Sequence, residues 1–306
     1  MEYVNCNLCG ADNTELLFAA NDATSGTPSP FSVVRCVDCG LVYTNPRPTK
    51  EELQQYYPSD YYADLIARRK SIIGVASGVL ARLAGALQGM VGHKMNIPLK
   101  AGDKILDLGC STGEYLDSRR KLGFDTYGVE LNPEASEYAR EKRGLKVFTG
   151  NLEEAHYPRE YFDGVYVSHV LEHVPDPTGT LLEIHHILKQ HGSLAISIPD
   201  SESLEARLLK RYWLSWDIPR HLYHFSPGSI RLLLDKTGFE TTRVKHDPHP
   251  GRVLASFNSL LGTWKINAPT KVICYSLFYP FGYLSGIGLG WLGSSGSMAV
   301  YARKKQ

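Results

Sequence analysis

The stretch ILDLGCSTGEYL, residues 105–116, decides the fold of this chain. Its first four residues belong to a short, mostly apolar strand, a glycine-containing loop follows, and the last residues begin a helix. A dinucleotide fingerprint would need glycines at 109, 111 and 114, but the chain has Ser111 and Glu114 and sets Asp107 at the strand end. Acidic residues around the loop suit a ligand with a cationic amino group better than a pyrophosphate.

Outward from this stretch, short apolar runs alternate with helical patterns. The predicted strands are KILDLG, DTYGVE, LKVF, FDGVYVSHV, SLAISI, TTRVKH and SMAVYARK. Strand-helix alternation builds a parallel sheet with helices between its strands. The sequence therefore predicts an α/β fold with a doubly wound, mostly parallel seven-stranded sheet of Rossmann-like type.

Ligands of such sheets bind beyond the carboxyl ends of the strands. Glu130 ends the second predicted strand, and its carboxylate there could accept hydrogen bonds from two ribose hydroxyls. Together with Asp107 it indicates a nucleoside that carries positive charge.

Four segments resemble the class I S-adenosylmethionine-dependent methyltransferases: ILDLGCSTGEYL, YGVELNP at 127–133, TGNLEEA at 149–155 and FDGVYVSHVLEHVPDP at 162–177. By this resemblance Asp107 lies near the methionyl amino group of the cofactor and Glu130 holds the ribose. Asn151 stands where many members carry Asp in the segment that contacts adenine. The implied cofactor site comprises Asp107, Gly109, Cys110, Ser111, Gly113, Glu130, Leu131, Asn151, Leu152, Ser168 and His169.

The fourth segment also spells His169-x-x-Glu172-His173, formally the inverted motif of a zinc protease. That motif needs a continuous helix to turn both histidines toward one metal. Here a strand is predicted up to Val170, and prolines follow at 175 and 177. We therefore do not expect a metallopeptidase.

Near the N-terminus, two Cys-x-x-Cys-Gly frames with 26 residues between them predict a zinc ribbon. The expected zinc ligands are Cys6, Cys9, Cys36 and Cys39. Four protein thiolates leave no position for an activated water, so the zinc should be structural. A pair of redox dithiols is the alternative. We expect the two remaining cysteines, Cys110 and Cys274, to be small buried hydrophobic side chains.

The expected organisation is a zinc ribbon at 1–48, a helical linker at 49–100 and a methyltransferase domain at 101–306. Within the linker, Thr49 and Glu52 predict a capped helix start, and an amphipathic helix is expected over 63–92. An apolar helical insertion is expected at about 250–293, in a region where residues 272–302 lack charge. It could be buried core, a substrate lid, or a lid that contacts the membrane surface beside the basic run at 68–70.

The linker segment NPRPTKEELQQYY and the segment WLSWDIPRHLYHFSP at 213–227 add a finer resemblance. Together with the zinc ribbon they resemble bacterial methyltransferases of sugars and cell-surface polysaccharides. Ser226 and Pro227 read as the N-cap and first residue of a helix, which would hold the preceding residues at the cofactor edge.

A hydroxyl acceptor needs a base near neutrality, and histidine is the side chain closest to that requirement. We predict His221 as the base, His224 as the second choice, and His173 and Tyr223 as residues that orient the substrate. Each histidine has a structural alternative, in which it bonds the loop backbone. Arg220 could hold an anionic group or form an ion pair.

Composition narrows the partners. With 33 basic and 32 acidic side chains, the net charge of +1 gives no field for nucleic acid. The absence of a signal-like start and the small number of cysteines favour the cytoplasm, with peripheral contact at the inner membrane face if the lid reaches it. The first hypothesis is methylation of a small-molecule or lipid-linked saccharide. A lipid or quinone-like acceptor is the alternative, and a non-catalytic binding protein is the third.

Overall fold

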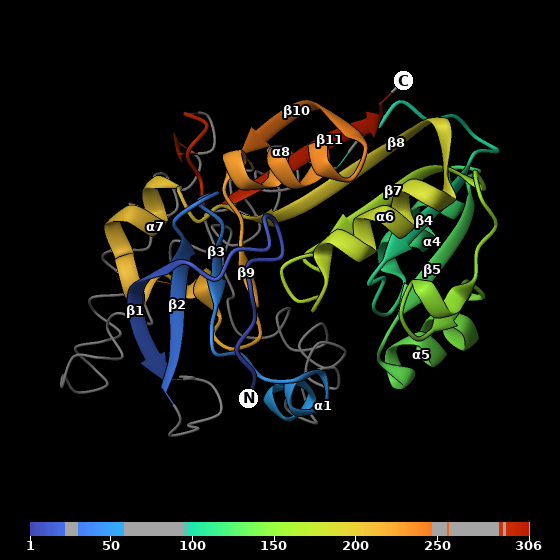
Figure 1. The fold of residues 1–306 in the computed structure, drawn as a ribbon. Coiled ribbons are helices and arrows are strands. Elements are labelled where there is room, and N and C mark those ends of the chain that lie inside the picture. The colour runs from blue at the N-terminus through green and yellow to red at the C-terminus, as the bar shows by residue number, and fades with distance from the viewer. Residues whose placement is uncertain are drawn as a thin grey trace, which may run out of the picture.

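A mostly parallel seven-stranded sheet dominates the computed structural model, which describes residues 1–21, 30–57, 95, 97–246, 256, 288–289 and 292–305 (Figure 1). In spatial order its strands are β10 (Phe239–His246), β11 (Ser297–Lys304), β8 (Leu188–Pro199), β7 (Phe162–Ser168), β4 (Lys104–Leu108), β5 (Asp125–Glu130) and β6 (Lys146–Thr149). Strands β4 to β8 are parallel, and β11 lies antiparallel between β8 and β10. The expected Rossmann-like sheet is confirmed.

The central strands are apolar because both faces of a parallel sheet are covered. In β7 and β8, Phe162, Val165, Val167, Leu194 and Ile196 are fully buried. The helices between and after the strands are α4 (Glu114–Arg120), α5 (Pro133–Arg143), α6 (Pro177–Ile187), α7 (Leu204–Leu209) and α8 (Pro227–Lys236). This packing holds the carboxyl ends of β4, β5, β7 and β8 at a common edge.

Three of these helices begin with the same local device, a capping side chain followed by proline. The caps of α5, α6 and α8 are Asn132, Asp176 and Ser226. Each side-chain oxygen accepts a hydrogen bond from a backbone N–H three residues on, and proline loses no helical bond at the first position. The predicted start of α8 is confirmed. The predicted Thr49–Glu52 box is also present, at α1 (Lys50–Leu53).

A second, four-stranded antiparallel sheet lies beside the first (Figure 1). Its order is β1 (Thr14–Asn21), β2 (Pro30–Cys36), β3 (Val42–Thr44) and β9 (Tyr223–His224). The first three strands come from the cysteine-rich N-terminal segment, whereas β9 comes from the segment 213–227. Tyr43 and Tyr223 are paired across β3 and β9. The small sheet is therefore completed by the part of the chain that follows β8.

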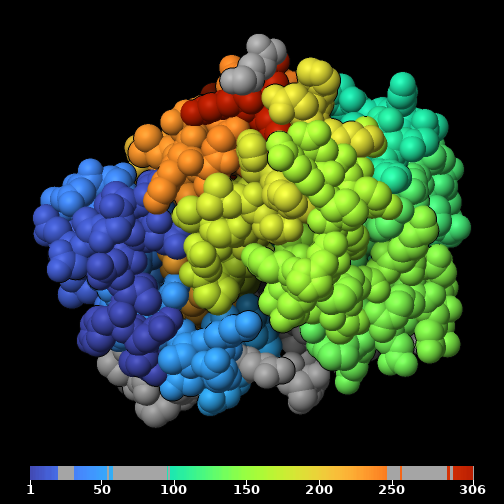
Figure 2. Space-filling model, turned by 45° about the vertical axis from the view of Figure 1, so that its right-hand side comes forward, coloured from blue at the N-terminus to red at the C-terminus, as the bar shows by residue number. Residues whose placement is uncertain are grey.

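Polar contacts also join the N-terminal segment to the helices of the larger unit. Asn7 donates from Nδ2 to Asp176 at 2.9 Å and accepts from the hydroxyl of Thr178 at 2.6 Å. Lys236 at the end of α8 donates to the carbonyl of Leu8 at 2.7 Å. Figure 2 shows the N-terminal residues, in blue, packed against the larger unit.

Strand β7 ends at Ser168, two residues before the predicted Val170, because His169 adopts a left-handed φ of 54° that breaks the strand. The predicted helix over 63–92 lies outside the described residues, as does the insertion at about 250–293 apart from residues 256, 288–289, 292 and 293. The interpretations of that insertion as core, lid or membrane contact stay predictions. In the described ranges, no helix has the length and apolarity needed to span a bilayer. Short 3-10 turns complete these ranges at Gln54–Tyr56, Glu153–Ala155, Lys210–Tyr212 and Leu214–Trp216.

Candidate active site

Two glycines shape the loop after β4. Gly109 and Gly113 both have φ of 74°, in the left-handed region that side chains rarely adopt. A Cβ on Gly109 would collide with Val170, and one on Gly113 would collide with Leu145. The left-handed backbone and the packed side chains of Val170 and Leu145 therefore both require glycine at these positions. Close approach of a ligand to this backbone stays a prediction.

Asp107 lies next to this loop at the carboxyl end of β4 and is only 6% exposed. Its carboxylate receives no hydrogen bond from the described residues. Burial and the nearby Glu130 raise the pKa of Asp107 to about 7. A buried acid without a cationic partner is costly, and a cationic ligand group would remove that cost. The site thus fits the methionyl ammonium of S-adenosylmethionine.

Glu130, at the end of β5, is also buried, and it organises the loop. Its Oε2 accepts from the backbone N–H of Ser111 at 2.8 Å, and Oε1 accepts from that of Asn132 at 2.8 Å. Each carboxylate oxygen can accept a second hydrogen bond. Glu130 can therefore hold the loop and still receive the ribose hydroxyls.

The other predicted cofactor residues line the same edge in different ways. Cys110 is buried in a core cluster with Leu116 and Val147, and its thiol donates to the carbonyl of Ser111 at 3.8 Å. Leu131 is 68% exposed after β5, and Ser168 is exposed at the end of β7. After β6, the Asn151 side chain accepts from the backbone N–H of Glu154 at 2.9 Å, and Leu152 is buried. Asn151 thus fixes the turn that would approach adenine.

A second group of side chains, Glu172, His173 and His221, meets beside the loop; we call it the acceptor-side cluster. One ligand-capable atom from each lies within 4.8 Å of the others. The two imidazole rings cross edge to face with centroids 4.5 Å apart. Glu172 and His173 follow β7, and His221 precedes β9. Hydrogen bonds from the backbone N–H groups of Leu222 and Tyr223 to the carbonyl of Glu172 join the two loops.

Backbone carbonyls set the tautomers of both rings. Nδ1 of His173 lies 3.0 Å from the carbonyl of Arg220, and Nδ1 of His221 lies 2.8 Å from that of Ser215. A carbonyl can only accept, so each Nδ1 carries the proton and each Nε2 keeps a lone pair in the neutral ring. Burial, aided by His173, lowers the pKa of His221 to about 4. The ring is therefore neutral near pH 7.

Glu172 is the buried acid of the cluster, with 1% exposure. Its Oε1 lies 3.1 Å from Nδ1 of His169. His169, predicted as a cofactor residue, therefore contacts Glu172 through this ring nitrogen. Oε2 of Glu172 is buried without a hydrogen-bond partner among the described residues. Burial alone would raise the pKa of Glu172, but the hydrogen bond and charge of His169, with His173 and His221, lower it to about 2. Glu172 is thus a carboxylate that carries an unsatisfied oxygen.

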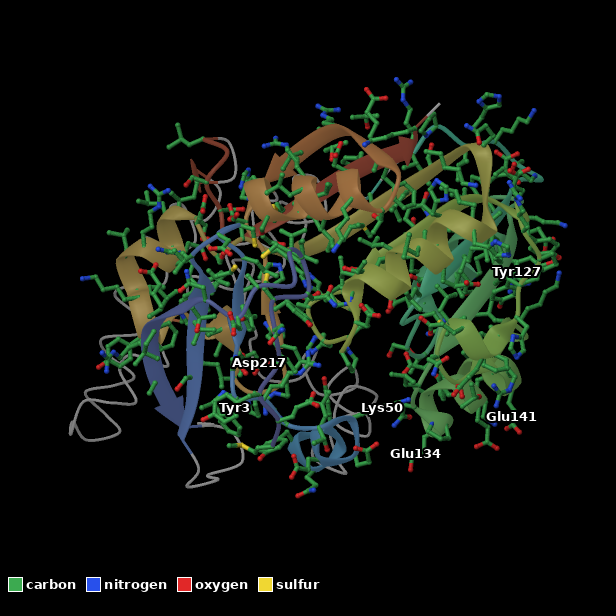
Figure 3. All side chains as sticks on the ribbon, in the orientation of Figure 1. Tyr3, Lys50, Tyr127, Glu134, Glu141 and Asp217 are labelled. Atoms are coloured by element: carbon green, nitrogen blue, oxygen red, sulfur yellow. The ribbon has the colours of Figure 1, made fainter. Side chains whose placement is uncertain are left out.

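The remaining predicted residues have structural partners. His224 is buried in β9, with Nε2 3.2 Å from the hydroxyl of Thr44, and burial lowers its pKa to about 3. The Tyr223 hydroxyl donates to the carbonyl of Pro175 at 3.0 Å. Of the two roles predicted for Arg220, the structure has the ion pair, in which Nε donates to Asp217 at 3.0 Å. Asp217 is labelled in Figure 3.

Sequence reasoning did not assign a role to Arg47 and Tyr57, which bond to the loops around the cluster and to His173. Arg47, from NPRP, donates to the carbonyl of Pro175 at 3.1 Å and to the Tyr223 hydroxyl at 2.9 Å. The Tyr57 hydroxyl lies 3.0 Å from Nδ1 of His173. The position of Arg47 between two prolines was the feature that could have drawn attention to it. The local sequence does not indicate its partners, because they lie far away in the chain.

The four cysteines of the two frames also meet. Cys6 and Cys39 lie 3.4 Å apart at sulfur, as do Cys9 and Cys36. Tetrahedral zinc with bonds of about 2.3 Å needs sulfur atoms about 3.8 Å apart, so a small expansion would accommodate the ion. Gly10 and Gly40, with φ of 82° and 77°, let the backbone turn after each pair. This arrangement is compatible with a zinc module.

A glycine loop between buried acids, at the carboxyl edge of a Rossmann-like sheet, defines an α/β protein that binds a cationic nucleoside. Residues 79–244 match the family model of the methyltransferase domain. The chain belongs to this family, in the class that takes its methyl group from S-adenosylmethionine.

Curated relatives are ubiquinone biosynthesis O-methyltransferases. The mitochondrial one of Schizosaccharomyces pombe is 37% identical over 116 residues, which are 36% of this chain and 42% of the relative. That of Shewanella sp. is 33% identical over 102 residues, 31% of this chain and 43% of the relative. The chain thus spans less than half the length of either. Among solved structures, the [4+2]-cyclase SpnF has a similar fold, with a TM-score of 0.50 and 18% identity over 85% of this chain and 98% of SpnF.

Proposed function

We propose that this protein transfers the methyl group of S-adenosylmethionine to a hydroxyl oxygen of a phenolic, quinone-like acceptor. The names of the relatives support this acceptor, which is the alternative in the sequence analysis, over the saccharide. The finer resemblance to sugar methyltransferases finds no counterpart in these two relatives.

The observation that carries the proposal is the position of the acceptor-side cluster. Val170, two residues before Glu172, lies where a Cβ of Gly109 would be, so the loop after β7 packs directly on the cofactor loop. The backbone bond from Leu222 to Glu172 adds the loop that carries His221. Groups able to bind a hydroxyl and handle its proton therefore lie beside the place where the methyl donor would bind.

The chemistry is an in-line displacement. The bond from sulfonium sulfur to methyl carbon breaks and sulfur keeps the electron pair, while the acceptor oxygen forms the new bond and its proton leaves. The protein has to align the oxygen, exclude water and remove the proton of the acceptor hydroxyl. We assign the handling of that proton to the acceptor-side cluster, with His221 as its principal member and with His224 and Tyr223 as supports for the loop.

For the N-terminal segment we propose a structural zinc bound by Cys6, Cys9, Cys36 and Cys39. In this proposal residues 1–48 form the zinc ribbon, 49–100 the linker and 101–306 the methyltransferase domain. The pairing of β3 with β9 supports a role in holding the acceptor loop, because that strand pair joins the ribbon to the residues after His221.

The test uses the full-length chain and S-adenosylmethionine with a labelled methyl group. A catechol that carries a short isoprenoid chain and a nucleotide-linked sugar are supplied separately, and label is counted in organic and aqueous products. We expect methyl ether in the organic phase, and much less with Asp107→Asn because its cofactor site lacks the carboxylate. Label only in the sugar would replace our acceptor with a saccharide. Cofactor binding without transfer to either would contradict the proposal in favour of a binding protein.

A further inference from the structure

We propose that Glu172, His173 and His221 bind one divalent transition-metal cation at the acceptor side of the cofactor loop. This site is distinct from the four cysteines. It also differs from the inverted protease motif, because residues 169–173 are not helical and the third ligand comes from the loop before β9.

The donor set is two imidazole nitrogens and one carboxylate oxygen, which suits Zn²⁺, Mn²⁺ or Fe²⁺. With bonds of about 2.1 Å, neighbouring ligand atoms lie about 3 to 3.5 Å apart around such an ion. The three atoms now lie within 4.8 Å of one another. Small inward rotations of the side chains would therefore bring them to bonding distance.

Both histidines have the outer hydrogen bond that metal-bound histidines usually have. Their Nδ1–H groups point at the carbonyls of Arg220 and Ser215. In metal sites this contact fixes the ring orientation and leaves Nε2 as the ligand atom. Each ring is thus already held in the tautomer that a cation needs.

Glu172 supplies the independent observation. The Glu172 side chain is only 1% exposed, and its Oε2 has no hydrogen-bond partner among the described residues. Leaving a buried charged oxygen unpaired costs more than leaving a neutral one. The nearby Arg220 guanidinium is engaged by Asp217. A cation between the two rings would satisfy this oxygen.

At this position the cation has a role that rests on the proposed function. It would bind the acceptor oxygen, which loses its proton to solvent more readily there. The oxyanion then attacks the methyl carbon and sulfur leaves with the electron pair, so atoms and charge balance. A catechol, with two adjacent oxygens, could occupy two open positions of the ion.

The test measures Mn²⁺ binding by electron paramagnetic resonance. The full-length protein first receives one equivalent of Zn²⁺ to fill the thiolate site, which disfavours the harder Mn²⁺. We expect one Mn²⁺ per chain, with nitrogen coupling from imidazole in pulsed spectra. Glu172→Gln and His221→Gln should each weaken Mn²⁺ binding by about 100-fold. Loss of a hydrogen-bond partner of a metal ligand typically weakens metal binding by about 10- to 100-fold, and loss of the ligand itself should cost at least as much. Asp107→Asn, in the cofactor loop, should bind Mn²⁺ as the parent does.

Circular dichroism and thermal unfolding show whether each variant keeps its fold, and His173→Gln provides a third ligand variant if one of them does not. Absence of Mn²⁺ binding in the parent, equal binding in the folded ligand variants, or absence of nitrogen coupling would each overturn the proposal. The methyl-transfer assay is separate: transfer to the catechol without cation binding contradicts this inference alone. Cation binding without transfer contradicts only the proposed function.

Discussion

Thr44, the last residue of β3, donates its side-chain hydroxyl to the backbone carbonyl of His221 at 2.9 Å. Both partners are buried, and the bond joins the cysteine-rich segment to the acceptor-side cluster. The cysteine-rich segment is therefore part of the support for the candidate active site.

Removing the Thr44 hydroxyl should lower stability and methyl transfer without changing cofactor affinity. We expect Thr44→Val to lower the free energy of unfolding by about 1 to 2 kcal/mol, because the buried carbonyl loses its donor. Methyl transfer should fall several-fold while calorimetry gives unchanged cofactor affinity. Ser118→Ala, which removes an exposed hydroxyl bonded to the carbonyl of Tyr115, is the control and should change little. Equal effects of the two variants would contradict the assigned role.

The acids of the cofactor loop should determine affinity for S-adenosylmethionine. Asp107→Ala and Glu130→Ala are each expected to weaken binding by about 1 to 3 kcal/mol through loss of charge-assisted hydrogen bonds. Glu130→Ala should also loosen the loop, because it removes the acceptor for Ser111. Calorimetry measures both effects. Unchanged affinity in both variants would mean that the cofactor binds elsewhere.

The thiolate site should be needed for fold and for activity. Elemental analysis is expected to find one zinc per chain and a loss of that zinc in Cys9→Ser. Because β3 holds β9, the variant should lose methyl transfer more severely than cofactor binding. Cys110→Ala, which removes a thiol outside the four, should retain the zinc. A Cys9→Ser protein that folds and works normally would refute the structural role.

Steric exclusion at Gly113 can be separated from backbone strain. Gly144→Ala places a side chain at φ 64° with nothing within 4 Å, so only strain of about 1 to 2 kcal/mol is expected. Gly113→Ala, at φ 74°, should cost about 1 to 3 kcal/mol more because its Cβ meets Leu145. Denaturant unfolding measures both. Equal losses would show that the loop has room for a side chain.

His221 is expected to be the most sensitive residue for turnover. His221→Ala should lower it about 100-fold or more and leave cofactor affinity nearly intact, as losses of groups that handle the substrate proton typically do. His224→Ala should act mainly through stability, because that ring is bonded to Thr44. If His221→Ala stays within about threefold of the parent, the role belongs to another group.

Local sequence determined much of this protein by itself. The order of strand, glycine loop and helix at 105–116 predicts the first turn of the sheet, since periodicity and backbone freedom act within a few residues. The same holds for the Ser226–Pro227 helix start and for the two cysteine frames, where neighbouring residues supply the cap or the predicted ligands. Asp107 and Glu130 could be placed at one sheet edge from the sequence, because strand ends of a parallel sheet share that edge.

Tertiary structure decided what joins these parts. A strand of two residues such as β9 has no periodicity, so its pairing with β3 depends on how the cysteine-rich segment docks. The contact between His173 and His221 depends on two loops that separate strands bring together. Both rings bond to backbone carbonyls, which every residue carries, so no residue type in the sequence marks these bonds. The unpaired oxygen of Glu172 arises only when burial removes water from it. Burial and contacts between distant segments are properties of the whole fold, and no local pattern encodes them.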